Sequence, residues 1–226
     1  MPDELRDLLI RPRYSFAESD RLAAATRGTS KRWLAGYEYV SEERGVRRQP
    51  PVTAPAAGRE AVSFLDLVEV AAIAGLRGEG FSLGQIRSIA KNCQEVLGVE
   101  RPLASLKFKT GGRDIFVDVG EQLIEVGRHK RQLAWNDVLQ PFLANLDYSS
   151  EIGFAMRWWP HGRSVPIVVD PAFGFGFPVI QGSGVRTEII LERFRAGDLH
   201  DQIAADFSLD PVEVERALQF ELKRAA

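Results

Sequence analysis

The segment SFAESDRLAAATRGTSKRWLAG, residues 15–36, predicts two short helices joined by a tight glycine turn. Ser15 and Glu18 form a capping box, in which the serine caps the first helix and the glutamate reaches back to it. That helix runs to about Ala24, and Gly28 then breaks the chain. Two helices joined in this way are the core of a helix-turn-helix, whose second helix enters the major groove of DNA.

The second predicted helix begins with small polar and basic residues. Thr29 or Ser30 is expected to cap it, while Trp33 and Leu34 are expected to anchor its other face. Side chains at the start of a recognition helix meet base edges and phosphates. Residues 11–48 hold nine Lys or Arg against five Asp or Glu, a local excess of positive charge. The predicted DNA-binding residues are Arg27, Thr29, Ser30, Lys31, Arg32, Tyr37, Arg44, Arg47 and Arg48.

Residues 42–58 contain three prolines and two glycines, so this run cannot be a helix. Its arginines fit a β-wing that contacts the DNA backbone. A small helical hairpin with ordinary solvated arginines is the alternative interpretation of residues 15–48. Beyond the run, one helix is expected from Ser63 to Gly78, and a capping box predicts another from Ser82 to Gly98.

The period of the hydrophobic residues changes in the middle of the chain. From Leu103 to Val119 apolar and polar residues alternate around Thr110-Gly111-Gly112, which predicts a β-hairpin. Leu123–Val126 is a further candidate strand. A helix broken or started by Pro141 is expected between Trp135 and Leu146, and residues 149–162 are expected to be irregular.

The last third begins with a predicted strand, Val165–Val169, followed by a glycine-rich loop in which Pro178–Ile180 can pair as an edge strand. Three helices follow, over Thr187–Arg195, after a cap at Asp198 and from Pro211. The predicted fold is α+β and mostly helical, with an N-terminal winged helix-turn-helix, a central β-hairpin region and a C-terminal three-helix module. The corresponding predicted domains are residues 13–98, 99–164 and 165–226.

Composition sets limits on the function. The 226 residues are 45% hydrophobic with a net charge of −2, so any surface for nucleic acid must be local. The single cysteine, Cys93, excludes an internal disulfide and favours a reducing compartment. No run of about eighteen apolar residues predicts a membrane span, and residues 1–6 lack the pattern of a secretory signal. The expected location is the cytoplasm, with no membrane partner.

The order of motifs in residues 13–98 resembles the DNA-binding domain of MerR-family regulators. The motifs are Tyr14–Glu18, Leu22-Ala23, Arg32–Leu34, the basic run, Val62–Leu67 and Gly80–Arg87. The resemblance implies a winged domain in which Gly80–Arg87 opens the fourth helix. MerR proteins dimerise through a long coiled-coil helix, whereas the helix from Ser82 ends at Gly98, too short for sustained heptads.

Residues 167–220 resemble a small C-terminal domain of VapB-type antitoxins. The matching motifs are Ile167–Pro171, Phe177–Gly182, Ala196–Asp198 and Ile203–Asp206. After the glycine of this motif the family usually continues Thr-Arg, whereas this chain has Ser183-Gly184. Any role of the family's arginine would therefore have to be taken over by Arg186. The resemblance implies a cognate toxin, a PIN-like ribonuclease, as partner.

Residues 185–226 hold six Lys or Arg against nine Asp or Glu, which favours protein binding or dimer formation over a second DNA site. Trp158, Trp159 and Arg186 are the predicted partner-binding residues, although tryptophan pairs are more often part of a core. The expected partners are operator DNA, the toxin and a second copy of the chain in a homodimer.

No catalytic or metal-binding pattern stands out. His129, His161 and His200 are isolated from one another and from Cys93, so neither a metal site nor a cofactor is expected. The leading hypothesis is a non-enzymatic antitoxin that represses its own operon. Two alternatives remain: a MerR-like ligand-responsive regulator with a pocket in residues 103–162, and an interaction scaffold that does not bind DNA.

Overall fold

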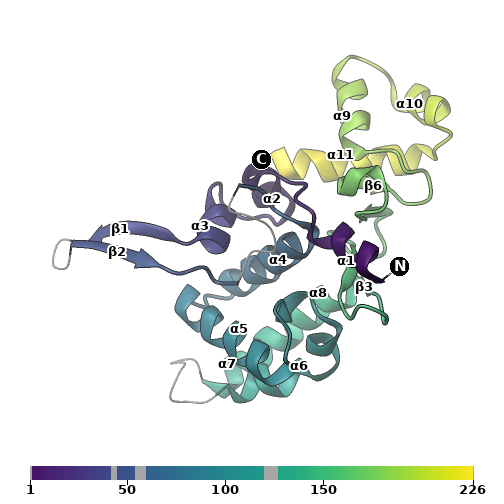
Figure 1. Ribbon diagram of the computed structural model, residues 1–226. Helices are drawn as coiled ribbons and strands as arrows, with labels where there is room; N and C mark the ends of the chain where they lie inside the picture. Colours follow the sequence, from purple (N-terminus) through teal and green to yellow (C-terminus); the bar gives the residue numbers. More distant parts are fainter. Residues whose placement is uncertain (1, 42–44, 54–59, 120–126, 226) are drawn as a thin grey trace. The chain divides into compact units, whose positions relative to one another are not determined.

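The computed structural model describes residues 2–41, 45–53, 60–119 and 127–225 (Figure 1). These residues are mostly helical with two small sheets, as the sequence predicts. The chain forms two compact units: residues 1–144 with 148–155, and residues 145–147 with 156–226. In the part of the chain described, no helix is long and apolar enough to cross a membrane.

The elements of the first unit are α1 (Pro2–Ile10), α2 (Phe16–Leu22), α3 (Thr29–Ala35), β1 (Tyr37–Ser41), β2 (Gly45–Gln49), α4 (Phe64–Gly78), α5 (Leu83–Leu97), a 3₁₀ turn (Pro102–Ala104), α6 (Leu106–Asp118), α7 (Arg128–Ala134), a π-helical turn (Trp135–Leu139) and α8 (Gln140–Ala144). The chain then forms β3 (Leu146–Tyr148), β4 (Ala155–Trp158), β5 (Ile167–Val169), a 3₁₀ turn (Gly174–Gly176), β6 (Pro178–Ile180), α9 (Thr187–Arg195), α10 (His200–Phe207) and α11 (Pro211–Ala225).

Helix α4 is the centre of the first unit. Residues 64–70 are all buried, and α1, α2, α3, α5 and the 3₁₀ turn at Pro102 pack around this helix. The helix begins after Ser63, where the sequence predicts its start, and the serine caps it by accepting a hydrogen bond from the backbone N–H of Asp66. Equivalent capping boxes begin α2 at Ser15 and α5 at Ser82, so these three helix starts are confirmed.

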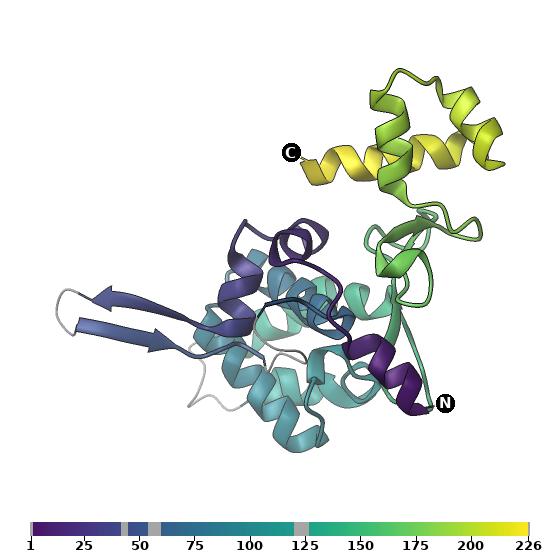
Figure 2. The ribbon, with the colours of Figure 1, turned by 45° about the horizontal axis from the view of Figure 1, so that its top comes forward.

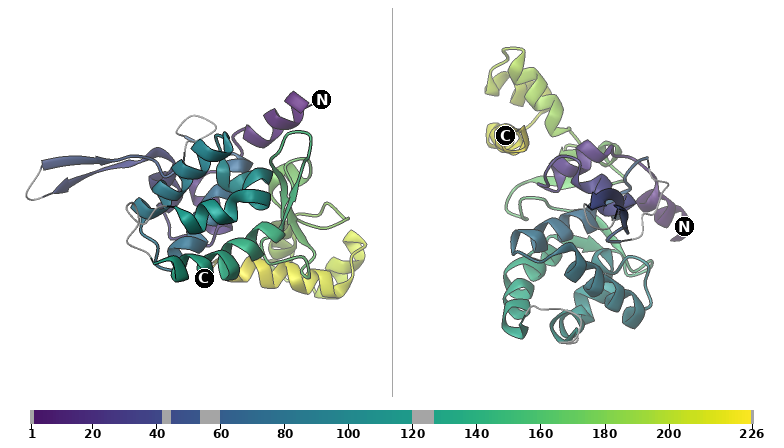
Figure 3. Two further views of the ribbon diagram at one scale, coloured as in Figure 1. Left: turned by 90° about the horizontal axis from the view of Figure 1, so that it is seen from below. Right: turned by 90° about the vertical axis from the view of Figure 1, so that its left-hand side faces the viewer.

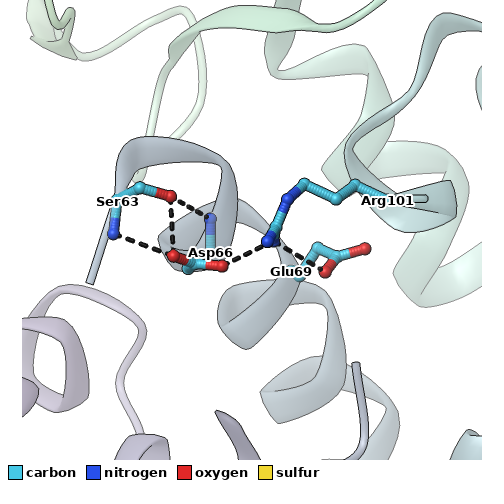
Figure 4. A network of polar contacts seen from close by, with 4 residues as sticks. All are labelled: Ser63, Asp66, Glu69 and Arg101. Carbon is cyan, nitrogen blue, oxygen red and sulfur yellow. Dashed lines mark hydrogen bonds and ion pairs between the residues drawn. The ribbon is translucent and has the colours of Figure 1, made fainter. Parts of the chain in front are cut away.

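A buried polar network fastens α4 to the chain after α5 (Figure 4). Nη1 of Arg101 lies 2.5 Å from Oδ1 of Asp66 and 3.5 Å from Oε2 of Glu69. Burial raises the pKa of Glu69 to about 7, against the lowering effect of the Arg101 charge, and the nearby Asp66 charge raises it further. Glu69 is therefore a buried carboxyl whose charge state changes near neutral pH.

The predicted hairpin at residues 103–119 is wrong, because Leu106–Asp118 is the helix α6. Its buried face follows a spacing of four residues through Phe108, Gly112 and Phe116, and Ser105 caps it. Gly112 lies directly beneath Phe108, where an added Cβ would come within 2.3 Å of the ring. Gly112 therefore serves helix packing rather than a turn.

Three further differences separate the structure from the sequence prediction. The helix predicted between Trp135 and Leu146 begins earlier, at Arg128. It passes through the π-helical turn just before Pro141, a residue that has no backbone N–H to donate. Residues 155–158, predicted to be irregular, form β4, and α1 has no counterpart in the sequence prediction. The predicted strand Leu123–Val126 lies outside the described residues.

The second unit joins a small sheet to three helices. The strands lie in the order β3-β4-β5-β6, and Val168 of β5 pairs with Val179 of β6 in antiparallel register. Ile180, next to Val179, joins the core of α9, α10 and α11. The backbone of these three helices forms the yellow-green to yellow part of Figure 2. Asp210 caps α11 at Pro211 as predicted. Asp198 does not cap α10, because it pairs with Arg193 instead.

Candidate nucleic-acid interface

Helices α2 and α3 pack against each other as a helix-turn-helix, joined by a turn with Gly28 in the left-handed region at φ 80°. The turn is fixed by Asp20 of α2, whose carboxylate accepts hydrogen bonds from the backbone N–H groups of Gly28 at 2.6 Å and Ser30 at 2.7 Å. A helix has unpaired N–H groups at its first turn. Asp20 therefore caps α3 from the neighbouring helix.

The side chains of Thr29 and Ser30 face the protein and not the solvent. Ser30 has 0% of its surface exposed and donates a hydrogen bond to the hydroxyl of Ser19, and Thr29 is 6% exposed. The prediction that they cap α3 and contact DNA is corrected, because they hold α3 against α2. Trp33 and Leu34 are buried, as predicted for the anchoring face.

The cations of the helix-turn-helix lie on its exposed side. Arg27 in the turn and Lys31 and Arg32 in α3 are all exposed. Nε of Arg32 donates to the carbonyl of Gly28 at 3.3 Å, so its guanidinium stays beside the turn. Arg32 and Tyr37 line a surface hollow of about 490 Å³ together with Arg77 from the end of α4. Arg77 is a candidate that sequence reasoning missed, because nothing local places the end of α4 beside α3.

The predicted wing is the antiparallel hairpin of β1 and β2, which extends away from the helices of the first unit (Figures 1 and 3). Arg47 lies opposite Tyr39 and Arg48 opposite Glu38, and both arginines are exposed. Since side chains alternate between the faces of a strand, Tyr37, Tyr39 and Arg47 share one face. Arg44 lies outside the described residues.

Three contacts fix the base of the hairpin. Gly36 has φ 73°, and a Cβ there would lie 2.5 Å from the carbonyl oxygen of Gln49. The backbone N–H of Val52 donates to the carbonyl of Trp33 at 2.7 Å. Nε of Arg87 donates to the carbonyls of Pro50 and Pro51, and partial burial lowers the pKa of this arginine. The hairpin therefore leaves the domain in a defined direction.

The outer part of the hairpin carries an apolar pair. Val40 and Val46 lie opposite each other and are 77% and 71% exposed. Isolated two-stranded hairpins are only marginally stable in water, and neither valine packs on the helices. This end of the hairpin is therefore suited to contact another molecule.

The predicted partner-binding residues lie in the second unit. Trp158 and Trp159 are 5% and 6% exposed, so the prediction of an exposed tryptophan anchor is wrong: Trp158 pairs with β5, and Trp159 packs on Val168 and Val179. Arg186 is partly buried, with its guanidinium 4.4 Å from the centre of the Phe177 ring. Its contact with a partner stays a prediction.

The single cysteine is held in the core of the first unit. Cys93 is buried in the apolar face of α5, where burial raises the pKa of its thiol to about 12 and keeps it protonated. Within the described ranges, no three His, Cys, Asp or Glu residues are grouped so that they could hold a metal ion.

Comparison with known proteins agrees with a helix-turn-helix of the DNA-binding class in the first unit. Residues 12–89 match a family model described as "Putative DNA-binding HTH domain". Residues 167–220 match a second model, "Protein of unknown function (DUF433)".

Two proteins of Mycobacterium tuberculosis are similar over nearly the whole chain. One, named "Putative antitoxin VapB45", is 25% identical over 222 residues, which are 92% of this chain and 92% of that protein. The other, the uncharacterized protein Rv2308, is 26% identical over 225 residues, 96% of this chain and 92% of that protein. The crystal structure of Rv2018 from the same organism shares the fold, with a TM-score of 0.70 at 20% identity, covering 92% of this chain and 97% of that one.

Proposed function

We propose that this protein is the antitoxin of a type II toxin-antitoxin system, which represses its own operon by binding operator DNA and neutralises a PIN-like ribonuclease. The helix-turn-helix match and the distant antitoxin homologue together support a DNA-binding antitoxin or regulator. The toxin class comes from the VapB resemblance of residues 167–220, and the self-repression comes from that resemblance together with the MerR-like start of the chain.

The DNA-binding part of the proposal rests on how buried and exposed side chains are distributed along α3. Its buried residues, Ser30, Trp33 and Leu34, hold the helix in place, while Lys31 and Arg32 stay in solvent. The hairpin adds Arg47 and Arg48, so one domain presents cations on a helix and on a wing. This is the arrangement that a winged helix-turn-helix uses to straddle a groove and the flanking phosphates.

The ligand-responsive alternative receives less support from the geometry. It requires a pocket in residues 103–162, but α6 and the helical segment after it pack through Phe108, Phe116 and Trp135. Helix α5 ends at Gly98, so it also lacks the length of the coiled coil through which MerR proteins transmit a signal.

Binding to the DNA upstream of the gene tests the first half of the proposal. The double variant Lys31→Ala/Arg32→Ala should bind at least tenfold more weakly than wild type. Its plot of log affinity against log salt should be shallower by about 0.9 for each phosphate that the variant no longer neutralises. The matched control is Arg216→Ala/Lys223→Ala, which removes two exposed cations from α11. Equal weakening in both variants, or none in the first, would contradict the assigned interface.

Co-expression with the product of the adjacent gene tests the second half. An antitoxin should co-purify with that product and rescue growth when the product is toxic. Trapping of a PIN-like nuclease in an inactive complex would identify the toxin class. Absence of a complex and of rescue, with DNA binding intact, would leave a regulator that is not an antitoxin.

A further inference from the structure

The surface hollow beside α3 carries two arginines from different helices. Arg32 comes from α3 and Arg77 from the end of α4, and the rest of the described lining is uncharged. The hydroxyl groups of Thr26 and Thr29 belong to this lining as well. In a chain with a net charge of −2, the hollow is therefore a place of local positive charge, where an anion is attracted.

The positive charge continues from the hollow to the turn between α4 and α5. Nη1 of Arg77 donates a hydrogen bond of 2.5 Å to the backbone carbonyl of Phe81 in this turn. Nζ of Lys130, in α7, lies 5.7 Å from the centre of the Phe81 ring. A Cβ on Gly80 would lie 3.4 Å from the same Nζ. Two helices that are distant in the sequence therefore place a cation at one turn.

These two cations are held in place without being neutralised. Arg77 and Lys130 are exposed, and neither forms an ion pair with a carboxylate of the described residues. Glu79 is the single carboxylate in residues 78–82, whereas Arg128, the α7 neighbour of Lys130, is paired with Asp118 at 3.2 Å. Long side chains lose conformational entropy when a partner fixes them. The contacts with Phe81 already restrict Arg77 and Lys130, which lowers that cost for an anion from outside the chain.

We propose that Arg77 and Lys130 bind backbone phosphates of the operator duplex, next to the phosphates that α3 contacts. The inference rests on the proposed function and deepens it, because Arg32 lines the same hollow as Arg77. Duplex DNA carries one negative charge per about 1.7 Å of its axis, so a surface that continues beyond the recognition helix meets further phosphates. Lys130 lies outside residues 12–89, so the DNA-binding surface extends beyond the helix-turn-helix match onto α7.

Two double variants separate the charge of these residues from their structural role. Arg77→Gln/Lys130→Gln removes both charges, whereas Arg77→Lys/Lys130→Arg keeps them. The neutral variant should bind the upstream DNA at least tenfold more weakly than wild type. Its plot of log affinity against log salt should be shallower by about 0.9 for each lost phosphate contact, and the charge-preserving variant should keep the wild-type slope. The matched control is Arg216→Gln/Lys223→Gln, two exposed positions of α11, which should bind like wild type.

Hydroxyl-radical footprinting at saturating protein locates the contact on the duplex. Arg77→Gln/Lys130→Gln should lose protection of a stretch of backbone that stays protected in Lys31→Ala/Arg32→Ala. An unchanged salt slope and footprint in the neutral variant would overturn the inference. Loss of toxin binding with the DNA contacts intact would also overturn it, by showing that these cations bind an acidic protein. A wild type that binds unrelated duplexes as tightly as the upstream DNA would instead count against self-repression and leave this phosphate contact standing.

Discussion

The carboxylate of Asp20 in α2 accepts a hydrogen bond of 2.7 Å from the backbone N–H of Ser30 in α3. Its other oxygen accepts a hydrogen bond of 2.6 Å from the backbone N–H of Gly28. One side chain therefore fixes the backbone of the turn between α2 and α3. The position of the exposed cations on α3 depends on this contact, because α3 has only seven residues and cannot be stable by itself.

Asp20→Ala should lower the free energy of unfolding by about 2 kcal/mol, because it leaves the buried N–H of Ser30 and the part-buried N–H of Gly28 without an acceptor. Asp20→Asn should have a smaller effect, since it keeps one acceptor oxygen. Urea unfolding measures both, and amide hydrogen exchange at Ser30 should accelerate in the alanine variant. Asp114→Ala, which removes an exposed carboxylate from α6, should unfold like wild type; equal effects at both positions would contradict the capping role.

Gly36→Ala should displace the hairpin. The new methyl group would meet the carbonyl of Gln49 at 2.5 Å, and alanine disfavours φ 73°. We expect a decrease of about 1–3 kcal/mol in the free energy of unfolding, together with weaker DNA binding. Retention of wild-type DNA affinity in a measurably destabilised Gly36→Ala variant would show that the hairpin does not contact the duplex.

Adjacent glycines in α6 should respond in opposite directions. Gly111 is exposed in the helix with open space around it, so Gly111→Ala should raise the free energy of unfolding by about 0.5–1 kcal/mol. Gly112→Ala should lower it, because the new Cβ would collide with the Phe108 ring. Urea unfolding of the two variants therefore distinguishes the helix α6 from the hairpin that the sequence predicts for the same residues. A decrease in stability at Gly111 would favour the hairpin.

Glu69 should make the protein less stable as the pH rises. The unfolded chain ionises this carboxyl near pH 4.5, whereas the pKa of Glu69 in the folded protein is raised to about 7. The stabilising contribution is complete below pH 4.5 and is lost as the pH rises through 7. Wild type should therefore lose about 2 kcal/mol more between pH 5 and pH 8 than Glu69→Gln does. Glu79→Gln, at an exposed carboxyl where α4 ends, should keep the wild-type profile; a wild-type profile in Glu69→Gln would exclude this residue as the source.

Local signals in the sequence were sufficient for much of the fold. The capping boxes at Ser15 and Ser82 each lie within four consecutive residues, and the proline after Asp210 marks the start of α11 in the same way. The helix-turn-helix, the C-terminal strands and the mostly helical class follow from such signals. The exposed cations Lys31 and Arg32 were found because polar and basic residues precede Trp33 in the expected helix.

Errors arose where the structure depends on contacts between distant residues. The burial of Thr29 and Ser30 requires α2 to lie across the turn, with Asp20 ten residues before Ser30. The helix α6 was missed because Gly111-Gly112 is a common turn sequence, and only the Phe108 ring shows why a glycine is needed there. Trp158 and Trp159 are covered by β5 and β6, strands whose pairing cannot be deduced from the tryptophans themselves.

The base of the β1–β2 hairpin is held by Gly36, Arg87 and the Val52–Trp33 hydrogen bond, while Val40 and Val46 lie beyond the helices. Substitutions in the outer half of the hairpin therefore have little effect on folding, whereas substitutions at its base disturb the domain. We expect the strength of the proposed contact with the DNA backbone to evolve mainly through the outer half, where new side chains can be tried while the protein stays folded.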